Sequence, residues 1–83
     1  MVDVVRRGLA AERLLADETF LDVVATIRAD ATGVFSNAKS GIDDIAEAHE
    51  AIRAVETILD EVRGRISTAQ IQEKSEGRHR ASD

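Results

Sequence analysis

The chain has 83 residues and a formal net charge of −5, and it contains no cysteine, tryptophan, tyrosine or proline. A chain of this length buries only about 60% of its unfolded surface, so its own core supplies modest stability. Without cysteine, disulfides and most structural zinc sites are excluded, which leaves association as the usual way to stabilise so small a protein. The negative charge and the scarcity of aromatic rings argue against nucleic acid as a main partner.

The apolar segments are too short for a membrane span. No run approaches the roughly 20 residues that cross a bilayer. The first stretch, MVDVVRRGLAAERLLADE, has charges scattered among its apolar residues and lacks the layout of a signal peptide. We therefore expect a soluble helical protein of the cytoplasm with no membrane contact.

Residues 3–16 are predicted to form a short first helix. Val4, Gly8, Ala11 and Leu15 recur on one side of it. Because glycine lowers helix propensity, we expect this helix to depend on packing rather than on its own stability.

The stretch RLLADETF, residues 13–20, interrupts the apolar pattern without proline or glycine. The carboxylate of Asp17 is well placed to accept hydrogen bonds from the free amides near Thr19 or Phe20, as the N-cap of a second helix. Glu18 adds a favourable charge to the first turn of that helix. A corner made by capping is thus predicted here, and the alternative is one continuous helix with a polar turn facing water.

Two heptad stripes follow, separated by the polar loop SNAKSG at residues 36–41. The first predicts a helix over residues 18–36, and the second predicts a long amphipathic helix over residues 43–70. Ser40, Asp43 and Asp44 are each candidates to cap the third helix. The stripes consist of Phe20, Val24, Ile27, Ala31 and Val34 in the second helix and of Ile45, Ala48, Ile52, Val55, Leu59, Val62, Ile66 and Ala69 in the third.

The fold class is therefore predicted to be all-α. A short loop makes the helices at 18–36 and 43–70 antiparallel neighbours in a hairpin, within a single domain at residues 1–71. Pairing Ile27 with Ile52 centres the turn between Lys39 and Ser40, inside the predicted loop. The expected hairpin core comprises Phe20, Val24, Ile27, Ala31, Val34, Ile45, Ala48, Ile52, Val55 and Leu59.

The third helix extends past Asp17, where the second helix begins, so part of its stripe needs another cover. Leftover apolar surface at helical spacing usually marks a partner surface. The residues expected to form it are Leu21, Val23, Ile58, Val62, Ile66 and Ala69. The alternative is that the first helix closes a small three-helix core and the protein is a monomer. The polar tail at residues 72–83 is expected to be disordered or held by a partner.

No constellation of residues predicts catalysis. The carboxylate pairs Asp43–Glu47 and Glu56–Asp60 lie off the apolar stripe, on a face that we expect to be solvated. Glu47 and His49 are two residues apart, which does not match the Glu-x-x-His spacing of di-iron bundles. We expect no catalytic residue, metal or cofactor, and hence no enzyme. A secondary possibility is phosphate contact through Arg6, Arg7 and Arg13 or through the tail's Arg78, His79 and Arg80.

The corner also carries a resemblance. RLLADETF, followed by IRAD and later by HEAIRAVETILDEVRGRI, resembles small helical proteins encoded by tailed bacteriophages and prophages, over roughly residues 9–70. Leu14, Leu15, Asp17 and Phe20 match the Leu-Leu-x-Asp-x-x-Phe corner of that group, whereas Glu18 stands where its members often have proline.

The resemblance implies a phage particle or its assembly as the setting. The expected function is that of a non-enzymatic structural protein of the virion, assembled in the bacterial host cytoplasm. Its expected partners are copies of itself, or capsid, portal or tail proteins, bound through apolar helix faces. Two alternatives stay open, namely a DNA-packaging ring subunit like small terminase subunits and a host-directed protein-binding adaptor.

Overall fold

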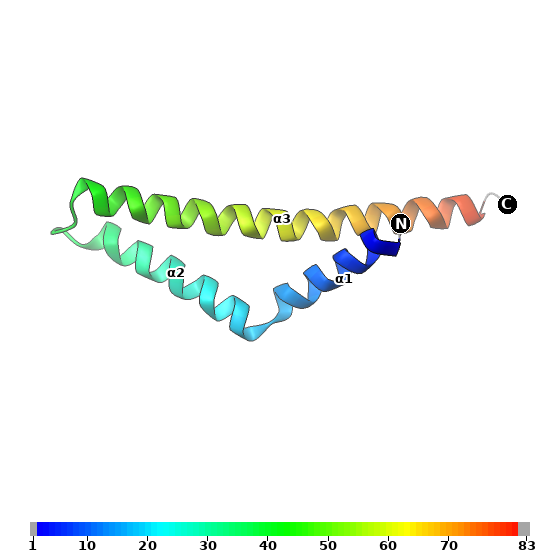
Figure 1. The fold of residues 1–83 in the computed structure, drawn as a ribbon, viewed down its shortest axis with the longest axis horizontal. Coiled ribbons are helices and arrows are strands. Elements are labelled where there is room, and N and C mark those ends of the chain that lie inside the picture. Colours follow the sequence, from blue (N-terminus) through cyan, green and yellow to red (C-terminus); the bar gives the residue numbers. More distant parts are fainter. Residues whose placement is uncertain (1, 82–83) are drawn as a thin grey trace. The chain divides into compact units, whose positions relative to one another are not determined.

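The structure, a computed structural model, describes the backbone of residues 2–81 and the side chains of residues 3–76. Three α-helices make up the secondary structure of this described part: α1 (Val2–Ala16), α2 (Glu18–Ser36) and α3 (Ile42–Ala81) (Figure 1). The all-α class predicted from the sequence is thus confirmed. The chain divides into two compact units, unit 1 (Met1–Asp17 with Asp60–Asp83) and unit 2 (Glu18–Leu59), and α3 contributes to both.

The break between the first two helices lies at Asp17. Helix α1 ends at Ala16 and α2 begins at Glu18, so the alternative of one continuous helix is wrong. The amide of Asp17 donates a hydrogen bond to the carbonyl of Leu14 at 3.1 Å, which closes the last turn of α1. The break therefore needs neither proline nor glycine, and the capping of α2 by the Asp17 carboxylate stays a prediction.

The loop between α2 and α3 spans residues 37–41 and satisfies backbone groups at both helix ends. The hydroxyl of Ser40 donates to the Val34 carbonyl at 2.8 Å, near the C-terminus of α2. On the other side, the amide of Gly41 donates to Oδ2 of Asp44 at 3.0 Å. Of the three capping candidates, Asp44 thus binds the residue that precedes α3, while Ser40 serves the end of α2.

The core of unit 2 lies between α2 and the first part of α3. Its buried residues are Val24, Ala31, Ala48, Val55 and Leu59, and those that are half-buried include Phe20, Ile27, Val34 and Ile52. Ile45, predicted as a core residue, is 37% exposed instead. It lies in the first turn of α3, beside the last turn of α2, where few side chains remain to cover it.

Unit 1 is held by an unusually close approach of α1 to α3. A Cβ built on Gly8 would clash with Cβ of Ala69 and would lie 3.2 Å from the carbonyl oxygen of Arg65. The missing side chain thus lets the two backbones approach, and Ala11 is buried on the same face of α1. Figure 1 shows the beginning of α1, in blue, beside the orange part of α3.

This packing corrects part of the predicted partner surface. Val62 is 9% exposed and Ala69 6% exposed, so both are buried, and Ile66 is half-buried. The prediction treated Gly8 only as a residue that weakens α1. In the structure, the same glycine lets α1 lie close enough to cover this part of α3.

Helix α3 also continues through Ala81, eleven residues beyond its predicted end at residue 70. Extending an existing helix needs no new nucleation, and the segment contains no proline. The side-chain amide nitrogen of Gln72 donates a hydrogen bond to Oε1 of Glu76, one turn further along, at 3.3 Å. The predicted polar tail at 72–83 is therefore helical as far as Ala81, and residues 82–83 lie outside the described part.

The contact at Gly8 can be tested by adding one methyl group. Gly8→Ala should lower the free energy of unfolding by about 1–2 kcal/mol, because overpacking against Ala69 outweighs the gain in helix propensity. Gly64→Ala is the matched control in unit 1, since its added Cβ meets nothing within 4 Å, and it should stabilise by about 0.5–1 kcal/mol. Urea denaturation measures both, and equal shifts in the same direction would contradict the close approach.

The helix break can be tested at Asp17. Asp17→Ala should lower the free energy of unfolding by about 0.5–2 kcal/mol, because the first amides of α2 lose an acceptor. Asp17→Asn keeps an acceptor of similar geometry and should retain most of the stability. Thermal melts followed by circular dichroism compare the two, and an alanine variant as stable as the asparagine variant would argue against capping.

Candidate protein-binding surface

The described part of the chain exposes more large apolar side chains than it buries. Only four buried residues are larger than alanine, namely Val24, Val55, Leu59 and Val62. Nine large apolar residues are exposed: Leu9, Leu14, Leu21, Val23, Phe35, Ile42, Ile45, Ile58 and Ile71. Single exposed apolar residues are normal, but such an excess at helical spacing points to surfaces that a partner covers.

Unit 2 contains a groove along one edge of the contact between α2 and α3. Its lining consists of Ile27, Asp30, Ala31, Val34 and Asn37 from α2 and the loop, and of Ser40, Asp44, Glu47, Ala48 and Ala51 from the loop and α3. Five of these side chains are aliphatic and form an apolar floor, whereas Asp30, Asp44 and Glu47 place carboxylates around it.

The groove exists because small residues occupy the facing positions. Ala31 and Ala48 are buried and Ala51 is half-buried, so little side-chain volume fills this edge. Val23 lies one turn before Ile27 on the same face of α2, and Ile58 lies two turns after Ala51 on α3. These two residues are 50% and 52% exposed, so they continue the apolar surface along the helices beyond the groove.

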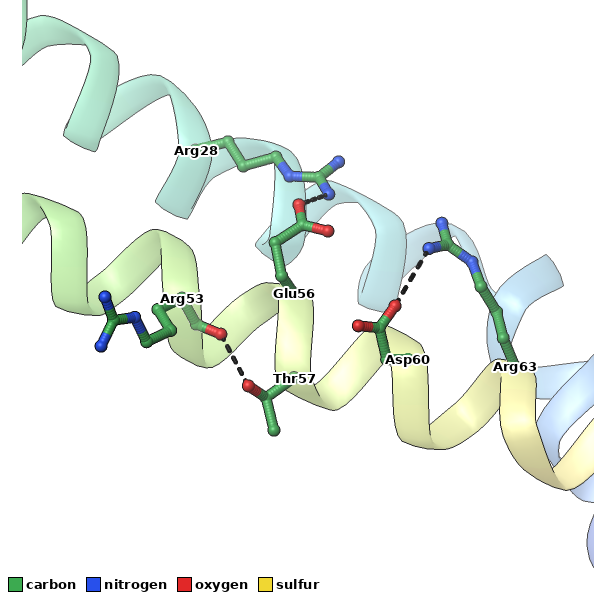
Figure 2. A network of polar contacts seen from close by, with 6 residues as sticks. All are labelled: Arg28, Arg53, Glu56, Thr57, Asp60 and Arg63. Carbon is green, nitrogen blue, oxygen red and sulfur yellow. Dashed lines mark hydrogen bonds and ion pairs between the residues drawn. The ribbon is translucent and has the colours of Figure 1, made fainter.

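The opposite edge of unit 2 is closed by side-chain pairs. The guanidinium of Arg28 forms an ion pair with Glu56, as Figure 2 shows. Further along the two helices, the ring centroids of Phe35 and His49 lie 4.7 Å apart. Arg28 and Asp30 are two positions apart, about 200° around α2, so the pairs and the groove lie on different sides. Both members of the ion pair are nearly half exposed, and such a pair contributes about 0–1 kcal/mol.

Unit 1 carries a basic strip on the outward face of α1. Asp3, Arg6, Ala10 and Arg13 are all exposed and follow one another at spacings of three, four and three, so they share one face, on which two cations outnumber one acid. Leu9 and Leu14 flank this face and are 48% and 37% exposed. The strip therefore combines two cations with accessible apolar side chains.

The units differ in charge. In the sequence, unit 2 holds eight acidic residues against three basic ones, whereas unit 1 holds eight of each. The whole net negative charge of the chain thus belongs to unit 2, and three of its eight acids, at positions 30, 44 and 47, line the groove. Within unit 1, two acids form ion pairs with arginines of the same helix. Oδ1 of Asp60 lies 3.8 Å from Nη1 of Arg63, as Figure 2 shows. Oε1 of Glu61 lies 3.5 Å from Nε of Arg65.

The residues predicted to form a partner surface differ in exposure. Leu21, Val23 and Ile58 are exposed, so they are accessible to a partner, whereas Val62 and Ala69 are buried. The groove itself was not predicted, because a heptad stripe marks its alanines as core and does not reveal unfilled space. Asp30 and Glu47, adjacent to Ala31 and Ala48, and Asp44, one turn before Ala48, are the signal that could have indicated it.

Among the described residues, no group of three or more His, Cys, Asp or Glu side chains could hold a metal ion. His49 contacts Phe35, and Glu56 of the predicted carboxylate pair contacts Arg28. Within the same described part, no helix is both long enough and apolar enough to cross a membrane.

Comparisons of the chain with protein families, with curated proteins and with solved structures found no match.

Proposed function

We propose that this chain is a non-enzymatic structural or assembly protein of a tailed bacteriophage particle, which binds other virion proteins through apolar helix faces. In this proposal α2 and the first part of α3 act as an antiparallel helical hairpin, and the chain works in the virion. The setting is supported by the resemblance of the corner residues Leu14, Leu15, Asp17 and Phe20 to small phage proteins.

The observation that carries the proposal is the excess of exposed over buried large apolar side chains. Burying one leucine, isoleucine or valine contributes about 1.5–3 kcal/mol, and four such buried residues make a thin core. The nine exposed ones in the described part of the chain are 37% to 86% exposed and offer this apolar area to partners. A protein that works inside a many-copy assembly is stabilised by the contacts that this area makes.

The direct test is the composition of the particle. In virions purified from a phage that encodes the chain, quantitative mass spectrometry should find it at a fixed copy number relative to the major capsid protein. A chain that is abundant in infected cells but absent from purified particles would contradict the proposal and favour a host-directed adaptor. Salt-dependent binding to duplex DNA by the purified chain would favour a packaging subunit, since phosphate contacts release counterions.

The apolar surface can be tested in the same particles. Replacing both Val23 and Ile58 by serine should strongly reduce incorporation, whereas the loss of stability should be about half that of two fully buried side chains because both are already half exposed. Circular dichroism at the growth temperature checks that the variant is folded. Ala54→Ser is the control, because Ala54 is exposed on α3 and does not line the groove. Incorporation of the double variant at the level of the control would show that this surface is not used.

A further inference from the structure

We infer that the groove of unit 2 binds the outward face of α1 from a second copy of this chain. The inference rests on the proposed function and specifies one of its partners. Two separate observations support it: the groove combines an apolar floor with a carboxylate rim, and the α1 strip combines exposed leucines with arginines.

The groove has the properties of a receptor for a basic amphipathic helix. Ile27, Val34 and Ala51 line its floor and are each only half-buried, so they lose more water when a helix covers them. Asp30 on α2 and Glu47 on α3 are exposed and stand on the two helices that line it. A helix lying in such a groove contacts it through residues spaced three and four apart.

The strip on α1 has the matching properties. Arg6 and Arg13 are seven residues apart, which is two helical turns or about 10 Å, with Ala10 between them. Alanine at the centre lets the helix lie close to a floor that is itself lined by small residues. Leu9 and Leu14, on either side, supply the apolar contacts.

The charged groups of both surfaces are available for this contact. Within the described part of the chain, neither Arg6 nor Arg13 forms a hydrogen bond or ion pair with another side chain, and the same holds for Asp30 and Glu47. Opposite charges on two apolar surfaces steer association and fix its register. Since unit 2 carries the whole net charge of −5, a cationic helix is attracted and an acidic one is repelled.

The experiment is a charge swap on the full chain, followed by sedimentation velocity over a range of concentrations. The variant Arg6→Glu with Arg13→Glu should weaken self-association roughly tenfold or more, because like charges then face each other. The variant Asp30→Arg with Glu47→Arg should do the same. An equimolar mixture of the two variants should restore association, because each supplies the face that the other lacks.

The control changes net charge equally but elsewhere. Arg53→Glu with Lys74→Glu alters two exposed cations outside both surfaces and should associate as the unmodified chain does. Arg13 lies in the last turn of α1, where a cation stabilises the helix end, so the single variant Arg6→Glu is also measured. Circular dichroism checks that each variant is folded. Raising the salt from about 0.1 M to about 1 M shortens the Debye length from about 10 Å to about 3 Å and should weaken the association.

Recovery in the mixture supports the inference, since general destabilisation by either pair of substitutions cannot produce it. A monomeric unmodified chain, or association that neither swap alters, would overturn it. Association that a groove variant abolishes but an α1 variant does not would also overturn it, and would assign the groove to a different basic helix. All of these results are independent of the copy number in virions, so the inference can fail while the proposed function stands.

Discussion

The structure depends on how closely helices can approach when the residues between them are small. Among the described side chains, alanine supplies four of the eight that are buried, at positions 11, 31, 48 and 69, and glycine permits the close contact at position 8. Small residues bring backbones together but remove little apolar area from water. Because so thin a core accommodates few large side chains, many of the larger apolar residues stay exposed on the surface. The small side chains of Ala48 and Ala51 likewise leave the groove unfilled.

Features set by local chemistry could be predicted from the sequence. The break at Asp17 follows from the amides that begin any helix and need an acceptor, and the loop at 37–41 follows from polar residues between two apolar stripes. Both are decided by residues within a few positions of one another. The helical extension of the polar tail could not be predicted from apolar period, because that period is evidence for packing, whereas α3 continues to Ala81 as the extension of a helix already formed.

Features set by pairs of distant residues were harder to predict. Gly8 has a low helix propensity, and only the presence of Ala69 opposite it makes that glycine a packing residue. Likewise, the heptad stripe shows that Ala31 and Ala48 face another helix, but not that their side chains are too small to fill the contact. Exposure of Val23 and Ile58 was predictable for the converse reason, since residues beside a stripe are covered only if a third element reaches them.

The proposed contact between copies joins two different surfaces, and this restricts the assemblies that it can build. Two copies that exchange α1 strips reciprocally use both surfaces of both chains and form a closed, two-fold dimer. If the exchange is not reciprocal, every assembly of copies keeps one unoccupied groove and one unoccupied strip, and association continues until a ring closes or a filament grows. In either assembly the side chains of Val23 and Ile58 continue the apolar surface beyond the groove, where a further protein can pack.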